Sequence, residues 1–525
     1  MKSGLLDYPL HPFLFLGYFF LFQFTNNLGQ VSFLSLMGPF ALALLVVGVL
    51  FLVAAWRSGD KKRAAVAISL FVLSFFSYGH LYGLIYARLP HVSELGLHLG
   101  LTEVYLAIFL AGKLTLNRIQ DVTPLNRTAN TMAGILLVFG GLPAVGFADL
   151  NGSPTSDEIE GILGGAVADL PSRTGALPDI YLIILDGYSR ADILSEHYTF
   201  DNRQMLDRLG ALGFIIAPRS RSNYAWTALS LASLLNLRYV DELALGKQDH
   251  GRAPIRAERL IRNNRLVRIL KEKGYRYVHF RSTWRATRRS PQADEVIKCR
   301  RSIFDEETYR ALVESSFLRT LNFAVIGDLA TCHLSQFDQL SQAGASPGPK
   351  FVFAHFIPPH HPYLFDQEGR VLRRATLANQ MEFRKNLWAD RKGYLQQLQF
   401  VNQRVLETIE RILTESPRDP LIVLMSDHGP QLPDADRAAY LDARFANLVA
   451  VHRPGGTDGD VFRLPDDITS VNLFRVLLRT HLEVALEPLP DQFFYSTFQT
   501  PYRFTEITEE LSRNGRDLGG GALEK

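Results

Sequence analysis

Two segments of the sequence place acidic side chains directly after an apolar run. The first is "IYLIILDGYSR", residues 180–190, which leads to Asp186, and the second is "LIVLMSDHGP", residues 421–430, which leads to Asp427 and His428. Short apolar runs of this kind are typical of strands that are buried on both faces. A carboxylate at the end of such a strand is costly to bury unless it meets a positive charge.

A divalent cation would supply that charge. If the two strands are parallel in one sheet, their carboxyl ends open on the same edge, where ligands of such sheets bind. Asp186, Asp427 and His428 would then converge in one small space and bind one ion. Two carboxylates and an imidazole, with the hydroxyl of Thr227 as a further donor, predict Mn²⁺ or Zn²⁺, and Mg²⁺ is also compatible.

A third segment, "SNYAWTALSLASLLN" at residues 222–236, supplies a candidate nucleophile. The pattern becomes helical after Trp226, so Thr227 lies where a helix begins, and a helix start favours phosphate oxygens. A threonine hydroxyl is a poor nucleophile until a base or a metal lowers its pKa, which the predicted cation would do. Taken alone, Thr227 would more often be an ordinary helix cap. Its combination with Asp186, Asp427 and His428 favours the catalytic interpretation.

The segment "FAHFIPPHHPYLFD", residues 353–366, carries His355, His360 and His361 near the end of a predicted strand. Imidazoles at this position could ligate a metal, bind a phosphoryl oxygen or protonate a leaving group. The alternative is that one or two of them are surface or packing histidines.

Arginines are candidates for binding a phosphate. Arg281 opens the basic stretch "RSTWRATRRS" after another predicted strand, and Arg444 precedes "FANLVAVH". An arginine can bind a phosphate with two parallel hydrogen bonds. A solvated or membrane-facing surface is the commoner role for such a basic stretch.

The first 150 residues are mostly apolar and predict a membrane domain. No charged residue occurs from Val31 to Trp56, which is long enough to cross about 30 Å of hydrocarbon. Basic residues follow the second and fourth candidate spans, so the amino terminus is predicted inside and the long carboxy-terminal part outside. The five candidate spans are Leu10–Asn27, Val31–Trp56, Ala64–Ala87, Leu95–Gly112 and Ala129–Ala148.

Beyond residue 178, short apolar runs alternate with helical patterns, which predicts a mostly parallel sheet with helices on both faces. Tyr394 to Ile412 repeats apolar residues at spacings of three and four, and Ile261–Leu270 and Val471–Leu482 look similar. The predicted strands are Ile180–Leu185, Phe214–Ala217, Tyr275–Phe280, Phe351–Phe356, Leu421–Met425 and Leu448–His452. The predicted layout is a five-helix transmembrane domain at 1–148, a linker at 149–178, a catalytic domain at 179–513 and a flexible tail at 514–525.

The four chemical segments together resemble the alkaline phosphatase and sulfatase superfamily. They are most similar to its membrane-anchored branch, the phosphoethanolamine transferases and lipoteichoic acid synthases. The resemblance implies that Asp186, Thr227, Asp427 and His428 hold the metal and that Thr227 attacks phosphorus. It also implies that His360 contacts the substrate, with His355 as its neighbour.

Several features depart from relatives in that superfamily. The C/S-x-P-x-R signature of true sulfatases is absent, since "ALSL" follows Thr227, and Gly187 stands where sulfatases have a second acid. Many transferases of the branch have glutamate at the position of Asp186, so the metal's position or preference can differ here.

The resemblance implies a membrane enzyme with an extracytoplasmic, periplasmic catalytic domain. It would transfer phosphoethanolamine or glycerol phosphate from a phospholipid donor to a glycan or lipid acceptor of the envelope, through a phospho-threonine intermediate. A hydrolase using the same residues, and a non-catalytic envelope-assembly protein, are the alternatives. The net charge of +3 gives no indication of nucleic acid as a partner, and no nucleotide-binding loop is found. The two cysteines, Cys299 and Cys332, could pair outside the cytoplasm.

Overall fold

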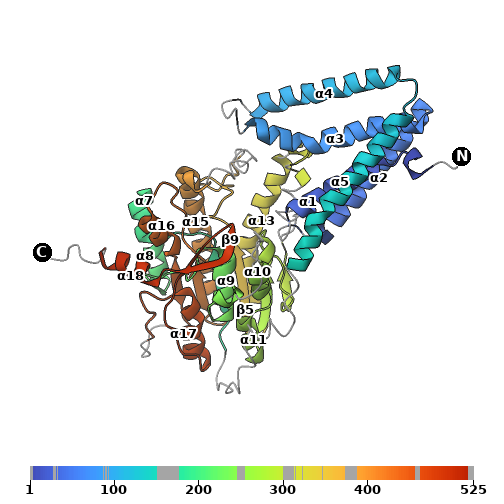
Figure 1. Ribbon diagram of the computed structural model, residues 1–525. Helices are drawn as coiled ribbons and strands as arrows, with labels where there is room; N and C mark the ends of the chain where they lie inside the picture. The colour runs from blue at the N-terminus through green and yellow to red at the C-terminus, as the bar shows by residue number, and fades with distance from the viewer. Residues whose placement is uncertain are drawn as a thin grey trace. The chain divides into compact units, whose positions relative to one another are not determined.

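The computed structural model divides into two compact units, which are described separately (Figure 1). One contains the amino-terminal helices, and the other contains a large sheet with its covering helices. The structure describes residues 4–27, 31, 33–86, 88, 92, 94–150, 177–244, 255–298, 312–313, 315–321, 323–345, 347–372, 387–455 and 462–517. Most of the predicted linker and the last residues of the predicted tail therefore lie outside the described residues.

The sheet has seven strands in the order β2-β7-β6-β1-β5-β3-β4. β1 pairs in parallel with both β5 and β6, so the chain leaves these three strands at the same edge. β7 runs antiparallel to β6 and β2, and the other pairs of neighbouring strands are parallel. The sheet is therefore mostly parallel, as predicted. The strands are β1 (Ile180–Leu185), β2 (Phe214–Ile216), β3 (Arg276–Phe280), β4 (Glu295–Ile297), β5 (Lys350–Phe356), β6 (Leu421–Met425) and β7 (Val449–His452).

Alternate residues of β1 face two separate apolar layers, which explains why the run is apolar throughout. Ile180, Leu182 and Ile184 pack with the layer that contains α9 (Thr227–Asn236), α11 (Arg265–Glu272) and α17 (Ser470–Leu482). The residues between them pack with the layer that contains α7 (Ala191–Tyr198), α8 (Arg203–Ala211) and α15 (Arg391–Glu415). Helices therefore cover both faces of the sheet, as predicted.

Some predicted elements differ in detail from the observed ones. The bounds of β1 and β6 are those predicted, but the single helix expected at Ile261–Leu270 is wrong. The chain instead forms α10 (Ile255–Arg262) and then α11, because the side chain of Asn264 accepts a hydrogen bond from the Val267 backbone and caps a new helix.

Three strands were not predicted. They are the edge strand β4 and a hairpin of β8 (Phe494–Thr497) and β9 (Thr500–Glu506). Helices α16 (Arg437–Phe445) and α18 (Thr508–Asp517) complete this unit's carboxy-terminal part, and α18 extends into the segment predicted as a tail.

The amino-terminal unit contains a helix at each of the five predicted spans. Within the described residues, three helices are long and apolar enough to cross a membrane, at Phe33–Ser58, Lys61–Tyr86 and Leu95–Arg118. The span count of five stays a prediction. The helices are α1 (His11–Asn26), α2 (Phe33–Ser58), α3 (Lys61–Tyr86), α4 (Glu94–Arg118) and α5 (Thr123–Leu150).

A short segment from far along the chain belongs to this helical unit. Residues 315–321 lie between β4 and β5 in the sequence, yet they pack on the amino-terminal helices. Ser315 accepts a hydrogen bond from Gln23 at 2.9 Å, and the Phe317 ring lies 4.8 Å from the Tyr78 ring. The guanidinium of Arg319 lies 4.2 Å from the centre of the Tyr82 ring. The segment therefore docks through hydrogen-bonding, aromatic and cation–π contacts.

Candidate metal centre

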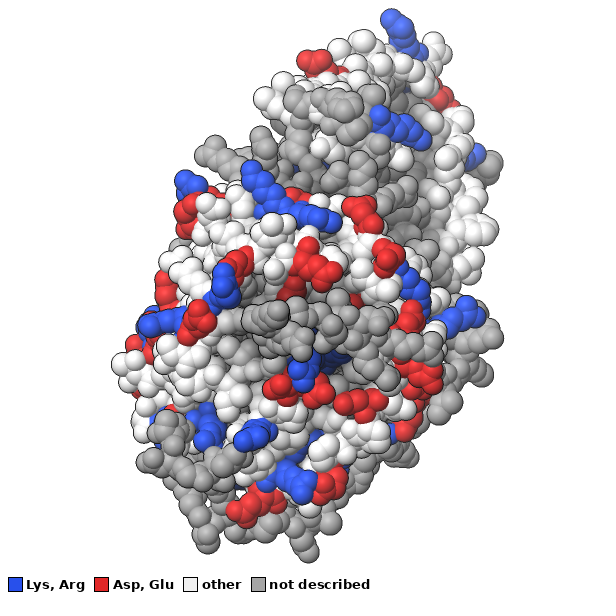
Figure 2. Space-filling model, turned by 90° about the vertical axis from the view of Figure 1, so that its left-hand side faces the viewer, with Lys and Arg blue, Asp and Glu red and all other residues white. Residues whose placement is uncertain are grey.

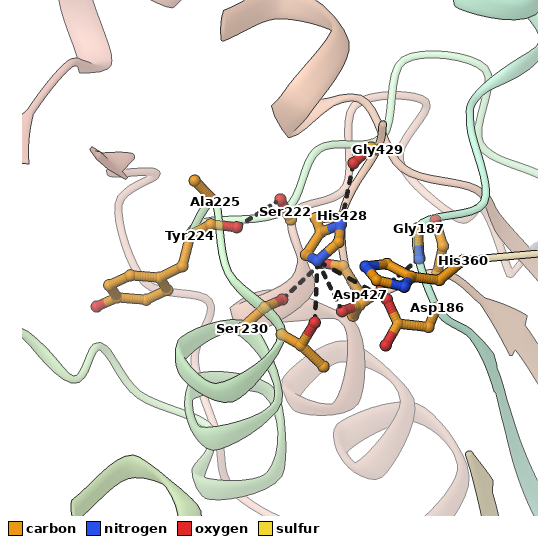
Figure 3. Close-up of polar contacts among 12 residues, drawn as sticks. Asp186, Gly187, Ser222, Tyr224, Ala225, Ser230, His360, Asp427, His428 and Gly429 are labelled. Atoms are coloured by element: carbon orange, nitrogen blue, oxygen red, sulfur yellow. Dashed lines mark hydrogen bonds and ion pairs between the residues drawn. The ribbon is translucent and has the colours of Figure 1, made fainter. Parts of the chain in front are cut away.

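The strand ends bring the candidate ligands together. Asp186 follows β1 and Asp427 and His428 follow β6, and these are adjacent parallel strands. One ligand atom from each of the three residues lies within 4.8 Å of the other two, and all three side chains are buried. Figure 3 shows the two carboxylates and the His428 imidazole converging, with His360 beside Asp186.

Two glycines allow this close approach. The Gly187 backbone donates a hydrogen bond to Asp427 Oδ1 at 2.9 Å, and Gly187 has φ +65°, a conformation that favours glycine. A Cβ there would also lie 2.7 Å from the Trp388 ring. At Gly429, a Cβ would overlap the carbonyl oxygens of Ala443 and Ala446. The "DG" and "HG" pairs of the sequence are therefore explained by local space and backbone geometry.

The His428 ring presents Nε2 to the cluster. Its Nδ1 lies 3.0 Å from the Gly429 carbonyl oxygen, so Nδ1 carries the proton and Nε2 carries the lone pair. Burial and the positive charge of Arg444 hold the pKa of His428 well below its usual range. The imidazole is therefore neutral and suited to bind a cation through Nε2.

Thr227 lies at the start of α9 and points into the same cluster. Its Oγ1 is 3.0 Å from His428 Nε2, while Ser230 of the same helix donates a hydrogen bond to the Asp427 carbonyl at 2.6 Å. The N-cap of α9 is Trp226, and Thr227 is the first helical residue. Thr227 is therefore not the N-cap residue, and the alternative of an ordinary helix cap is excluded.

Burying two carboxylates close together is electrostatically unfavourable. Asp427 is fully buried, and burial together with the nearby charge of Asp186 raises the pKa of Asp427 to about 7. Asp427 Oδ2 lies 3.2 Å from His428 Nε2, and Asp186 Oδ1 lies 3.9 Å from the same nitrogen. Two carboxylates, a neutral imidazole and a hydroxyl form a donor set that fits a single divalent cation.

His355 reaches the cluster from β5. Its Nδ1 lies 2.9 Å from Thr287 Oγ1, and its Nε2 lies 3.5 Å from Asp186 Oδ2. Burial lowers the pKa of His355 to about 4, so the ring is neutral. Thr287 was not identified from the sequence, where it is one polar residue within a basic stretch.

The loop after β5 places His360 at the edge of the cluster. The His360 backbone donates to the Asp186 carbonyl at 3.1 Å, and His360 Nδ1 lies 2.7 Å from the His361 carbonyl oxygen. The His361 ring packs against His360, with ring centres 4.0 Å apart, and both rings contact Trp388. His360 is the nearer of the two to the candidate ligands, and Trp388 was missed because nothing in its surrounding sequence marks it.

The two candidate arginines differ. Arg281 follows β3, two strands from β1 at the same edge of the sheet, and its carbonyl accepts a hydrogen bond from Gln336 at 2.6 Å. Arg444 is buried against the cluster, where its Nη2 lies 3.1 Å from His428 Nε2. The sequence indicated Arg444 only as a position before a strand and gave no indication of its burial.

Comparison with known proteins assigns the chain to a family. The model of the Sulfatase family matches residues 178–457, more than half of the sequence, and the chain therefore belongs to the sulfatase family. No curated protein sequence matches the chain.

Similar solved structures include two proteins of bacterial envelopes. The zinc complex of the C-terminal periplasmic domain of EptC from Escherichia coli is 12% identical, with a TM-score of 0.42. That alignment covers 66% of this chain and 96% of that one. The integral membrane protein lipooligosaccharide phosphoethanolamine transferase A from Neisseria meningitidis is 15% identical, with a TM-score of 0.38, and covers 90% of this chain and 94% of that one.

Proposed function

We propose that this protein transfers a headgroup phosphate from a membrane phospholipid to an acceptor in the cell envelope, through a phosphate ester on Thr227. The observation that carries this proposal is the position of Thr227 Oγ1 at the start of α9, 3.0 Å from His428 Nε2. Two buried carboxylates share the same space, and this grouping is suited to holding a divalent cation beside a nucleophile.

Asp186, Thr227, Asp427 and His428 are the residues proposed to hold one ion, Mn²⁺ or Zn²⁺, with Mg²⁺ also compatible. When bound, the cation lowers the pKa of the Thr227 hydroxyl and offsets the charge of the two carboxylates. The backbone N–H groups at the start of α9 favour a phosphoryl oxygen at the same place.

In the first step the Thr227 hydroxyl releases its proton to solvent, a bond forms between Thr227 Oγ1 and phosphorus, and the bond from phosphorus to the diacylglycerol oxygen breaks. His360 is the proposed proton donor to that leaving oxygen, because it lies at the edge of the cluster beside Asp186. In the second step an acceptor hydroxyl attacks phosphorus and gives its proton to His360, the bond to Thr227 Oγ1 breaks, and Thr227 regains a proton from solvent.

The proposed domain layout suits a lipid donor. Residues 1–148 would anchor the chain in the inner membrane, and residues 179–513 would form the catalytic domain on the periplasmic side. Tethering holds the catalytic domain near the bilayer surface and raises the effective donor concentration to about the millimolar range. The acceptor would be a glycan or lipid of the envelope.

The experiment incubates the full chain in membranes with labelled phosphatidylethanolamine or phosphatidylglycerol and follows diacylglycerol release and intact protein mass. A mass gain equal to the headgroup phosphate, absent in Thr227→Ala and retained in Thr227→Ser, is the expected result. Unchanged headgroup release by Thr227→Ala would refute the assignment of the nucleophile. Product analysis with and without an acceptor alcohol distinguishes transfer from hydrolysis.

A further inference from the structure

The side chain of Arg444 is almost completely buried and fixed at three points. Its Nε donates to the Ala225 carbonyl at 2.6 Å, and its Nη1 donates to the Gly429 carbonyl at 2.8 Å. Its guanidinium carbon lies 4.9 Å from the centre of the Trp226 ring. These contacts hold the guanidinium between the loop before Thr227 and the loop after His428, so its remaining nitrogen has a fixed direction.

That remaining nitrogen, Nη2, points at a candidate metal ligand. It lies 3.1 Å from His428 Nε2, the atom that also lies 3.0 Å from Thr227 Oγ1. The hydrogen-bond partners of Arg444 among the described residues are two backbone carbonyls and the neutral His428 ring. The charges of Asp427 and Asp186 act on this guanidinium without a direct hydrogen bond, so a phosphate oxygen bonded to it would further lower the cost of its burial.

Both Thr227 Oγ1 and Arg444 Nη2 lie within hydrogen-bond distance of His428 Nε2, and a cation would compete with them for its lone pair. His428 Nδ1 is engaged with the Gly429 carbonyl, so Nε2 offers the single lone pair of the ring. Arg444 Nη2 and a divalent cation cannot both use that lone pair. Binding of a cation at Nε2 would therefore free an N–H of Arg444 beside Thr227 Oγ1.

We propose that Arg444 binds a non-bridging oxygen of the substrate phosphate, and that it exchanges His428 Nε2 for this oxygen when the cation binds. This inference rests on the proposed function, which places phosphorus next to Thr227. It requires a substrate with an anionic non-bridging oxygen on phosphorus, which accepts a hydrogen bond from Nη2. Two backbone carbonyls already orient the guanidinium, so little reorganisation is needed to bind the anion.

Among the described residues on the face shown in Figure 2, no broad basic area suggests an anion site. Basic and acidic side chains are interspersed there, without a broad area of one sign. The buried guanidinium is therefore the stronger candidate for recognising the phosphate.

The proposal predicts opposite changes in two affinities. Arg444→Gln removes a positive charge and a competitor for His428 Nε2, so divalent cations should bind more tightly. The same substitution removes the anion's charged donor, so inorganic phosphate should bind more weakly. A residue with a purely structural role would weaken both affinities together when it is replaced.

The experiment uses the full chain in detergent. Zn²⁺ affinity is measured by competition with a chromophoric chelator, and inorganic phosphate affinity by calorimetry on the Zn²⁺-saturated protein. For Arg444→Gln we expect Zn²⁺ binding to tighten about threefold or more and phosphate binding to weaken about tenfold or more. Arg444→Lys keeps the charge without the fork-shaped donor, so it should leave Zn²⁺ affinity nearly unchanged and still weaken phosphate binding.

Arg190→Gln is the matched control, because Arg190 is a buried arginine bonded to the Ser220 carbonyl and Asp192. It should leave both affinities unchanged. Phosphate affinity within about twofold of wild type in Arg444→Gln and Arg444→Lys, or a joint loss of both affinities, would overturn the proposal. The proposed function is tested separately by the phosphate ester on Thr227. If the phosphate ester on Thr227 does not form while both affinities shift as expected, the proposed transfer reaction is refuted and Arg444 remains an anion ligand.

Discussion

Thr227 Oγ1 and His428 Nε2 lie 3.0 Å apart although 201 positions separate the two residues in the sequence. One belongs to the first turn of α9, and the other follows β6. Because Ser230 donates a hydrogen bond from the same helix to the backbone of Asp427, the candidate nucleophile and two candidate ligands form one connected unit.

Removal of the Thr227 hydroxyl should abolish transfer while the fold is retained. Thr227→Ala is expected to lower the rate of headgroup release at least about 10³-fold, as when a nucleophile is lost. Thr227→Ser should keep measurable activity because it retains the oxygen. Diacylglycerol release measures the rate, and equal thermal unfolding temperatures of the two variants exclude misfolding as the cause.

The two carboxylates should make the metal-free protein sensitive to pH. The pKa of Asp427 is raised to about 7 from its ordinary value of 3.8, so the folded state favours the protonated form of this group. Its contribution to stability is therefore most favourable below about pH 4 and declines as the pH rises toward 7. Asp427→Asn should unfold at a higher temperature than wild type at pH 8 in chelator, and the difference should shrink toward pH 5.

Saturating Zn²⁺ should reverse that trend in the wild type, because the ligands bind metal only when deprotonated. Thermal unfolding at pH 5 and pH 8, with and without Zn²⁺, measures both effects. Equal pH profiles for wild type and Asp427→Asn in chelator would contradict the proposed coupling between Asp186 and Asp427.

The loss of rate on replacing His360 should depend on the acidity of the leaving group. His360→Gln is expected to slow transfer from a phospholipid about 10²-fold or more, because the diacylglycerol alkoxide needs a proton. A p-nitrophenyl phosphodiester leaves without protonation, so its turnover should change much less. His361→Gln is the control, and an equal loss with both donors in His360→Gln would rule out the acid role.

Gly429 should not tolerate a side chain. In Gly429→Ala the new Cβ would overlap the carbonyl oxygens of Ala443 and Ala446, which lie around the end of α16. We expect destabilisation of about 2 kcal/mol or more, as for other overpacked sites. Thermal unfolding measures it, and Gly210→Ala, where a Cβ would meet nothing within 4 Å, is the control.

The sequence was most informative where one physical requirement dominates. β1 and β6 are buried on both faces, so their apolar runs have sharp ends, and Asp186 and Asp427 mark the same edge of the sheet. Parallel pairing then brings the candidate ligands together. That convergence could be predicted because it requires only the strand ends and the direction of pairing.

Other features depend on contacts between distant segments. The burial of Arg444 requires the carbonyls of Ala225 and Gly429, which no local pattern reveals. A new helix, α11, begins after Asn264 because this side chain caps it, although the apolar periodicity of the sequence continues across the break. Edge strand β4 is short and only partly buried, so it lacks the apolar run that identifies a central strand.

The packing of residues 315–321 on the amino-terminal helices affects how the protein can be cut into fragments. A secreted fragment starting near residue 177 would retain this segment but lack Gln23, Tyr78 and Tyr82, its partners in the helical unit. Phe317 would then be exposed to water, and such a fragment should aggregate or bind detergent unless the segment is replaced. Conversely, after a single proteolytic nick between residues 150 and 177, the two halves should co-purify, because these contacts remain in place.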